Sequence, residues 1–145
     1  MELKSVFLNN ERIPSKYTCD GENSGPELYV SGVPSNAKSL VLIIDDPDAP
    51  MGLFTHYVLF NIPVDTSKLL PSQPPKSAIE ARNDFGQNAY GGPCPPNGTH
   101  RYFFKIFALD KTINLKTGVV RQKVDDEMRG HVLEDAQLIG LYARH

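Results

Sequence analysis

Nearly unbroken apolar runs mark the strands at the centre of the predicted fold. Tyr102 to Leu109 is almost entirely apolar or aromatic, which predicts a core strand, and Ser39 to Ile44 predicts a strand buried on both faces. His56 to Ile62 predicts a third such strand, which opens with a histidine. Leu3 to Phe7 and Leu28 to Val30 predict shorter strands before them. The chain is therefore expected to build its core from β-structure.

The hydrophobic period changes near the end of the chain. Val120, Val124 and Met128 recur every four residues with charged residues between them, which predicts an amphipathic helix from Val120 to Arg129 and places His131 on it. Leu138 to Tyr142 predicts a final strand, and Asn61 to Pro75 a surface excursion. Together these elements predict an all-β dominated fold, a β-sandwich with a helical appendage.

Composition narrows the class of protein. The 145 residues suit a single domain, 1–145, and 12 prolines and 11 glycines indicate many turns. The net charge of −2, with no basic stripe, argues against a nucleic-acid partner. No apolar run reaches the roughly 20 residues that span a bilayer, and the N-terminus lacks the apolar centre of a signal peptide. A cytoplasmic location is therefore expected. The two cysteines are too few for a disulfide framework, but a single bridge stays open.

Three polar segments adjoin the predicted strands. Asp45 to Pro50 holds three carboxylates and two prolines directly after a core strand, and each X–Pro bond is left open as cis or trans. The stretch Tyr90 to Tyr102 is a stiff loop rich in proline and glycine that delivers His100 to the next strand. His56 opens its own strand. Because antiparallel strands place one strand's end beside its neighbour's start, these groups are expected to gather at one rim.

Such a rim has the chemistry of an anion site. Histidine N–H groups and the free amides of Gly91, Gly92 and Cys94 would donate to an anion, whereas Asp46 or Asp48 would orient a histidine or hold an ammonium group. Donors for phosphate beside carboxylates for an amine suit a zwitterionic headgroup.

At these residues the sequence resembles the phosphatidylethanolamine-binding protein family, also called Raf kinase inhibitor-like proteins, and in particular its small bacterial and archaeal branch. The resemblance covers essentially the whole chain. It is carried by three ordered motifs: Asp46-Pro47-Asp48-Ala49-Pro50, His56-Tyr57-Val58, and Gly92-Pro93-Cys94-Pro95-Pro96 with His100-Arg101-Tyr102. Further matches are Asp20-Gly21-Glu22-Asn23, Asn83-Asp84-Phe85-Gly86, Gly130-His131-Val132-Leu133 and Tyr142-Ala143-Arg144. Where the prokaryotic pattern usually has tryptophan, this chain has Val30 and Tyr57.

The resemblance implies a Greek-key sandwich of two antiparallel sheets with C-terminal helical segments. It also implies a pocket for phosphate, phosphate esters and similar anions, possessing no settled catalytic role. Carried onto this chain, Asp46 and Asp48 would form an acidic wall, His56 and His100 would ligate, and Gly92 to Pro96 would cradle the anion. The ligand-binding residues implied are Asp46, Asp48, His56, Gly92, Pro93, Pro95, Pro96, His100 and Tyr102. No cofactor and no metal is expected.

Three functions stay open on the sequence. The leading hypothesis is a non-enzymatic binding module for anionic small molecules or phospholipid headgroups. The second is a regulator that inhibits a serine protease or a kinase through its surface loops. The third is a hydrolase that uses Cys94 as nucleophile, or a metal held by His56, His100 and Asp46 or Asp48. A homodimer is left open as well.

Overall fold

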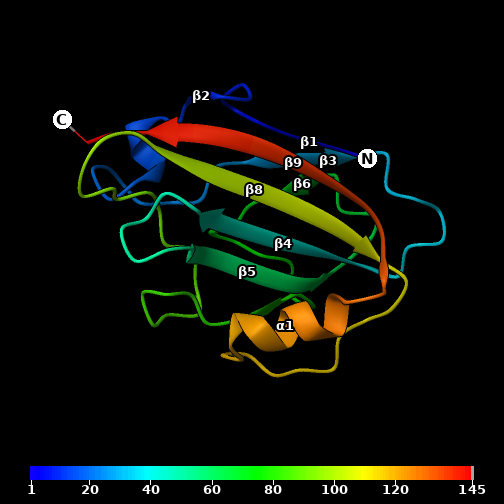
Figure 1. The fold of residues 1–145 in the computed structure, drawn as a ribbon. Helices are drawn as coiled ribbons and strands as arrows, with labels where there is room; N and C mark the ends of the chain where they lie inside the picture. Colours follow the sequence, from blue (N-terminus) through cyan, green and yellow to red (C-terminus); the bar gives the residue numbers. More distant parts are fainter. Residues whose placement is uncertain (145) are drawn as a thin grey trace.

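The computed structural model describes residues 1–144, which form two β-sheets, one α-helix and one short 3-10 helix (Figure 1). The smaller sheet has the strand order β1-β3-β6, and the larger has the order β2-β9-β8-β4-β5-β7. The strand bounds are β1 Glu2–Ser5, β2 Glu11–Arg12, β3 Leu28–Ser31, β4 Ser39–Asp46, β5 Phe54–Ile62, β6 Lys68–Leu69, β7 Ile79–Glu80, β8 His100–Leu109 and β9 Val132–Tyr142. A 3-10 helix spans Ser15–Tyr17, and α1 spans Arg121–Met128.

The predicted β-sandwich is confirmed. In the larger sheet β4, β5 and β7 follow one another as antiparallel neighbours, and β8 returns to pair with β4 on its other side. This order of strands is that of a Greek key. The resemblance implied antiparallel sheets, and among the strand pairs described one differs, because the short β2 runs parallel to β9.

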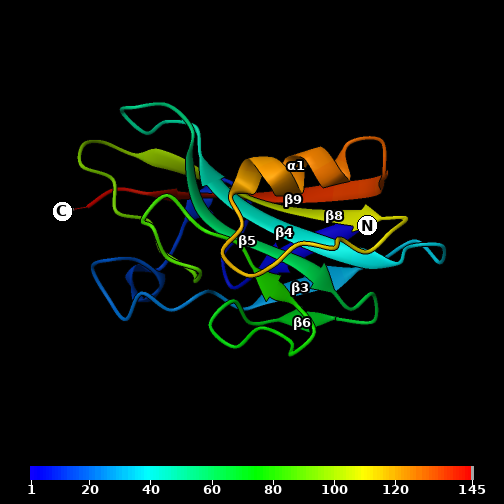
Figure 2. The same cartoon turned by 90° about the horizontal axis from the view of Figure 1, so that it is seen from below.

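The central strands of the larger sheet, β4 and β5, are buried on both faces, which explains their apolar runs. On β4, Leu40, Leu42 and Ile44 join the core between the two sheets, whereas Val41 and Ile43 join a second cluster on the opposite face. Alternate residues of a strand point to opposite faces, so the middle of a strand covered on both sides, here Leu40 to Ile44, is apolar at every position. Figure 2 shows β3 and β6 on one side of this sheet and α1 on the other.

The helix is shorter than the sequence predicts. Val124 and Met128 are buried against the second cluster, but Val120 lies before α1 and is half exposed, so the predicted helix begins one residue too early. His131 lies beyond α1 rather than on it, because Gly130 adopts a positive φ of 80° that ends the helical segment. No helix within residues 1–144 is long and apolar enough to cross a membrane.

The hydrophobic pattern did not predict the three shortest strands. β2, β6 and β7 have two residues each, and β6 lies inside the segment expected to be only a surface excursion. The peptide bonds before Pro47 and Pro50 are both trans.

Candidate functional site

A pocket of about 540 Å³ lies at the end of the larger sheet where β4 ends and β5 and β8 begin. The strands contribute polar side chains to it, and three loops contribute its walls. Six of the nine residues predicted for the site line it: Asp46, His56, Pro95, Pro96, His100 and Tyr102. The prediction that groups half a chain apart meet at one rim is therefore correct in its geometry.

His100 and Asp46 form a buried pair on neighbouring strands. The His100 Nδ1 atom lies 2.6 Å from Asp46 Oδ2, and both side chains are less than one tenth exposed. Two residues further along β8, Tyr102 points to the same face of the sheet, with its ring 6.4 Å from the His100 ring. The Nδ1–H group of His100 donates to the carboxylate, which leaves its Nε2 for the pocket.

A β-bulge brings His56 to this face. Ile44 of β4 pairs with Tyr57, and the next residue, Asp45, pairs with Thr55, so His56 is the extra residue of β5. Without a bulge, His56 would share the face of Val58, which packs in the second cluster beneath α1. A bulge re-aims side chains locally, and here it turns the imidazole toward Tyr102, at a ring distance of 5.3 Å.

His56 is held from behind by the loop that precedes β8. Its Nδ1 lies 2.7 Å from the carbonyl oxygen of Gly91, and the Gly91 amide in turn donates to the His56 carbonyl at 3.2 Å. Aromatic rings of Phe54 and Phe85 lie 4.9 and 5.4 Å from the imidazole. Burial lowers the pKa of His56 below the ordinary histidine value, outweighing the Gly91 carbonyl and nearby carboxylates, which act in the opposite direction.

The Tyr102 hydroxyl is buried without a hydrogen-bond partner among the described residues. The Asp46 carboxylate and the Cys94 amide are close enough to affect its pKa, but neither makes a hydrogen bond of good geometry. Burial, together with the negative charge of Asp46, raises the pKa of Tyr102, so the hydroxyl keeps its proton. A buried O–H donor is thus left unpaired at the floor of the pocket.

Asp48 does not line the pocket, so of the two carboxylates predicted for the acidic wall only Asp46 is there, and the second carboxylate of the lining is Asp84. Asp48 accepts hydrogen bonds from the backbone amide and the Nε of Arg101, both at 2.9 Å, and from its Nη2 at 2.8 Å. These bonds hold the pKa of Asp48 at about 2. Asp48 therefore fastens the loop after β4 to β8.

Gly92 and Pro93 also lie outside the lining, and the predicted amide cradle is wrong in part. The Gly92 amide donates to Asn23 Oδ1 at 2.9 Å, and the Gly91 amide is used by His56. A β-carbon on Gly92 would collide with Asn23 Oδ1 and with the Tyr17 carbonyl. Gly92 is thus needed for close packing of two loops rather than for anion contact.

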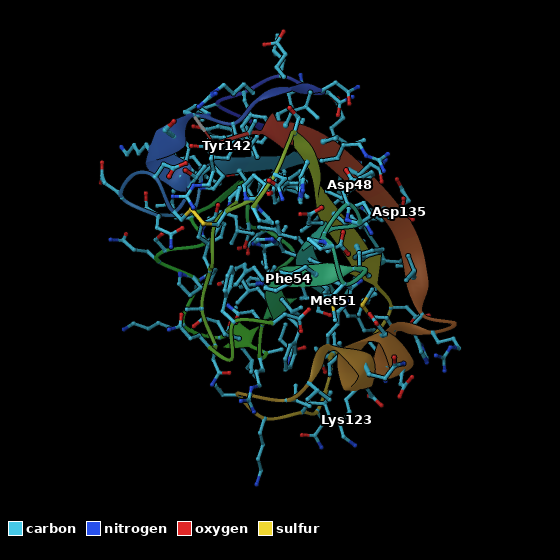
Figure 3. The ribbon with its side chains drawn as sticks, turned by 60° about the vertical axis from the view of Figure 1, so that its left-hand side comes forward. Asp48, Met51, Phe54, Lys123, Asp135 and Tyr142 are labelled. Carbon is cyan, nitrogen blue, oxygen red and sulfur yellow. A yellow bond between two sulfur atoms is a disulfide. The ribbon has the colours of Figure 1, made fainter. Side chains whose placement is uncertain are left out.

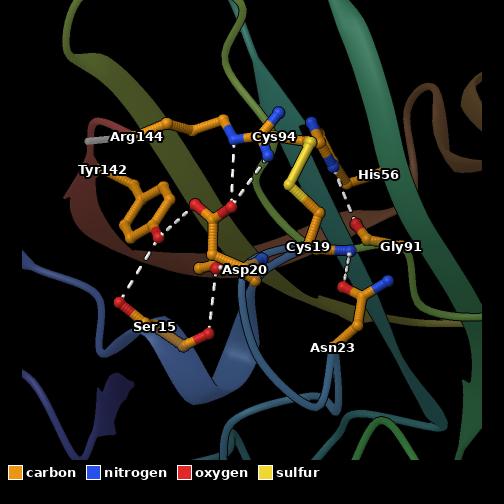
Figure 4. Close-up of a disulfide and its surroundings, with 11 residues drawn as sticks. Ser15, Cys19, Asp20, Asn23, His56, Gly91, Cys94, Tyr142 and Arg144 are labelled. Carbon is orange, nitrogen blue, oxygen red and sulfur yellow. Dashed lines mark hydrogen bonds and ion pairs between the residues drawn. A yellow bond between two sulfur atoms is a disulfide. The ribbon is translucent and has the colours of Figure 1, made fainter.

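A disulfide between Cys19 and Cys94 joins the same two loops (Figure 4). The Cys19 amide also donates to the Pro93 carbonyl at 3.1 Å. Cys94 lines the pocket, but it has no thiol in this state and cannot serve as the nucleophile of the hydrolase hypothesis. Within residues 1–144 no three His, Cys, Asp or Glu side chains lie close enough to hold a metal ion.

The rim of the pocket is apolar, which sequence reasoning missed. Met51 is fully exposed on the loop after β4, and Leu53 and Phe85 are about half exposed beside the mouth. Figure 3 shows Met51 and Phe54 close together near the start of β5. The signal for Phe85 was the Asn83-Asp84-Phe85-Gly86 turn, in which the Asn83 carboxamide oxygen accepts the Phe85 and Gln87 amides and fixes the loop.

The fold and the pocket define a β-sandwich protein with a small, partly polar pocket at one end of its sheets. The chain belongs to the phosphatidylethanolamine-binding protein family, whose profile matches residues 3–143. A UPF0098 protein of Methanothermobacter thermautotrophicus is 51% identical over 150 residues, which cover 99% of each chain. A UPF0098 protein of Pyrococcus horikoshii is 49% identical, over 99% of this chain and 77% of its own length.

Two crystal structures share the fold. A phosphatidylethanolamine-binding protein homologue from Chlamydia trachomatis superimposes with a TM-score of 0.94 at 37% identity, over 99% of this chain and 97% of its own. Escherichia coli YbcL, a member of the same family, superimposes with a TM-score of 0.90 at 28% identity, over 99% and 98% of the two chains.

Proposed function

We propose that this chain binds small oxyanions, above all phosphate groups, in the pocket between β4, β5 and β8, and that it acts by binding rather than by catalysis. The observation that carries the proposal is the Tyr102 hydroxyl, which is buried, protonated and without a partner. Leaving a buried donor unpaired costs about 1–3 kcal/mol. An acceptor atom from a ligand removes that cost.

The histidines complete the anion site. Asp46 accepts a hydrogen bond from His100 Nδ1 and fixes the orientation of that ring, so that Nε2 faces the pocket. In a complex in which the His100 ring is protonated, its Nε2–H and the Tyr102 O–H both donate to one anion from nearby positions on β8. Charge-assisted hydrogen bonds of this kind are about twice as strong as those between neutral groups.

The apolar rim extends the proposal to phosphorylated molecules that carry an apolar part, such as a phospholipid headgroup with its first methylene groups. Met51, Leu53 and Phe85 border the mouth and offer contact area beyond the polar floor. The family is named for phosphatidylethanolamine, and the headgroup assignment to this chain rests on that name together with the rim.

A titration followed by ¹⁵N NMR of the imidazoles tests anion binding. Inorganic phosphate added to millimolar concentration is expected to shift the His56 and His100 resonances along one saturating curve. His131, which is exposed and bonded to Asp110 far from the pocket, serves as the internal control. Histidine resonances that stay still, or that all move together in proportion to ionic strength, would remove the pocket from consideration.

A regulatory role through protein contact is the second candidate. The specific observation in its favour is Met51, which is completely exposed at the tip of a loop beside the pocket. Exposed apolar side chains on a loop are suited to partner contact. The test measures serine protease and kinase activities with excess protein, comparing the native chain with Met51→Ser. Inhibition that is equal for both proteins, or absent for every enzyme, counts against this role.

The cytoplasmic location stays a prediction. The feature that bears on it is the Cys19–Cys94 disulfide, because disulfides persist mainly in oxidising compartments and, as an exception, inside hyperthermophiles.

A further inference from the structure

The protonation pattern at His56 is set by its contact with Gly91. A carbonyl oxygen only accepts hydrogen bonds, so the 2.7 Å contact to Gly91 requires the proton of a neutral imidazole to be on Nδ1. Nε2, on the opposite side of the ring, then carries a lone pair. Because His56 lines the pocket, that lone pair is presented to a ligand as an acceptor.

The surroundings of His56 favour the neutral ring. The imidazole is 4% exposed and is enclosed by the rings of Phe54, Phe85 and Tyr102. Burial is the largest influence on its pKa and lowers it, so the ring is mostly neutral at pH 7. The titratable groups that face it from β4, β8 and the loop before β8 are Asp45, Asp46, Asp84, His100 and Tyr102.

The pocket therefore offers two kinds of polar group. Tyr102 presents a hydrogen-bond donor, and His100 Nε2 does so when its ring is protonated, whereas His56 Nε2 and the Asp84 carboxylate present acceptors. A fully deprotonated oxyanion satisfies the donors but sets an oxygen lone pair against the lone pair of His56. An oxyanion with an O–H group satisfies both, because its hydroxyl donates to His56 Nε2.

We propose that the site selects oxyanions that carry their own proton, namely inorganic phosphate and phosphate monoesters, over sulfate and phosphate diesters, with His56 as the residue that discriminates. The proposal rests on the proposed anion-binding function and narrows it, because a phospholipid headgroup is a phosphate diester and would be the weaker ligand. A monoester has a second pKa near 6, so about a quarter of it still carries the shared proton at pH 6.5. A diester or sulfate has no such proton, so its complex requires protonation of His56 itself.

The proton shared between His56 and the ligand also makes affinity depend on pH. Each complex contains one proton between His56 Nε2 and the ligand, whichever of the two supplied it. Above the pKa values of both groups, that proton must be taken from solution. Affinity is then expected to fall about tenfold per pH unit, because one proton is bound with each ligand.

Calorimetry with four probes tests the proposal: inorganic phosphate, sulfate, phosphoethanolamine as a monoester, and glycerophosphoethanolamine as the matching diester. At pH 6.5 the phosphate and the monoester are expected to bind at least tenfold more tightly than sulfate and the diester, a difference of about 1.4 kcal/mol. The monoester and diester arms also separate a soluble phosphorylated molecule from a lipid headgroup.

Two variants assign the effect to His56. His56→Asn replaces the fixed acceptor with a carboxamide that can donate as well as accept, so the preference for phosphate over sulfate is expected to shrink to below threefold. His131→Asn changes a histidine that bonds to Asp110 outside the pocket and is expected to leave the preference unchanged. If His56→Asn does not fold, the fall in monoester affinity of the native chain between pH 7 and pH 9 replaces it as the second measurement.

The outcomes separate the two proposals. Equal affinity for all four probes, or a preference for the diester, overturns the selection by proton while leaving the anion site in place. Absence of binding by every probe removes the anion site and the selection with it. A preference that survives His56→Asn in a folded protein overturns the role of His56.

Discussion

The unpaired hydroxyl of Tyr102 predicts that stability and binding respond in different directions to one substitution. Tyr102→Phe removes a single oxygen atom and keeps the aromatic ring, whose contacts with the His56 and His100 rings lie at 5.3 and 6.4 Å. The variant therefore isolates the hydroxyl from the packing of the core.

The two magnitudes follow from where the hydroxyl lies. In the free protein it makes no hydrogen bond, so its removal costs none and relieves a buried polar group. We expect the free energy of unfolding to stay the same or to rise by up to about 2 kcal/mol. In the complex it donates to a charged oxygen, a bond that contributes about 1.5–3 kcal/mol, so anion affinity is expected to fall about 10- to 150-fold.

Urea denaturation and phosphate calorimetry measure the two effects on the same preparations. Tyr142→Phe is the matched control, because Tyr142 is equally buried on the neighbouring strand β9 but donates to Asp20 Oδ2 at 2.6 Å. That variant is expected to lose about 1–3 kcal/mol of stability and to keep its affinity for phosphate.

Two results would refute the reasoning. A loss of more than about 1 kcal/mol in Tyr102→Phe means that the hydroxyl has an internal partner, such as Asp46 or the Cys94 amide. Unchanged phosphate affinity in a stable Tyr102→Phe protein means that the hydroxyl does not contact the anion.

Two further predictions concern the loops around the pocket. Arg101 holds the pKa of Asp48 at about 2, so their pairing stabilises the fold above pH 4 and is lost as the pH falls toward 2. Asp48→Asn is therefore expected to cost up to about 1 kcal/mol in urea denaturation at pH 7 and almost nothing at pH 2, since the pair is partly exposed to solvent; an equal cost at both values would contradict this. The Cys19–Cys94 disulfide closes a loop of 75 residues, so the double substitution to serine is expected to lower the free energy of unfolding by about 4 kcal/mol on the loop-entropy account, measured by denaturation without reductant. A loss below about 1 kcal/mol would show that the hydrogen bonds between the two loops hold them together on their own.

Much of the fold could be predicted from the sequence because burial leaves a local signature. The strand that contains Leu42 is covered on both faces, so its residues are apolar without interruption, and the period of α1 is set by the face that Val124 buries. Val120 has the same four-residue spacing, but α1 begins one residue after it, and the Val120 side chain is half exposed.

The candidate site was predictable in outline and not in detail. Asp46 and His100 lie at the adjoining ends of antiparallel strands, so their meeting follows from topology. The position of Asp48 outside the pocket does not follow from topology. Asp48 binds Arg101, the residue after His100 in the sequence, instead of facing the pocket. The Gly92 amide likewise found a partner in Asn23, a residue 69 positions away. Hydrogen bonds between residues far apart in the sequence produce no periodic pattern, so these partners could not be predicted from the sequence.

Because His56 is a bulge residue of β5, the number of residues in this part of the strand matters to the pocket as much as their identity. Deleting Thr55 would remove this bulge from the ladder with β4 and rotate the imidazole of His56 to the side covered by α1. The histidine would still be present in the sequence, yet the acceptor would have left the cavity. An alignment of homologous chains should therefore compare the number of residues across this bulge. Matching residue types alone do not show whether a homologue presents the histidine to the pocket.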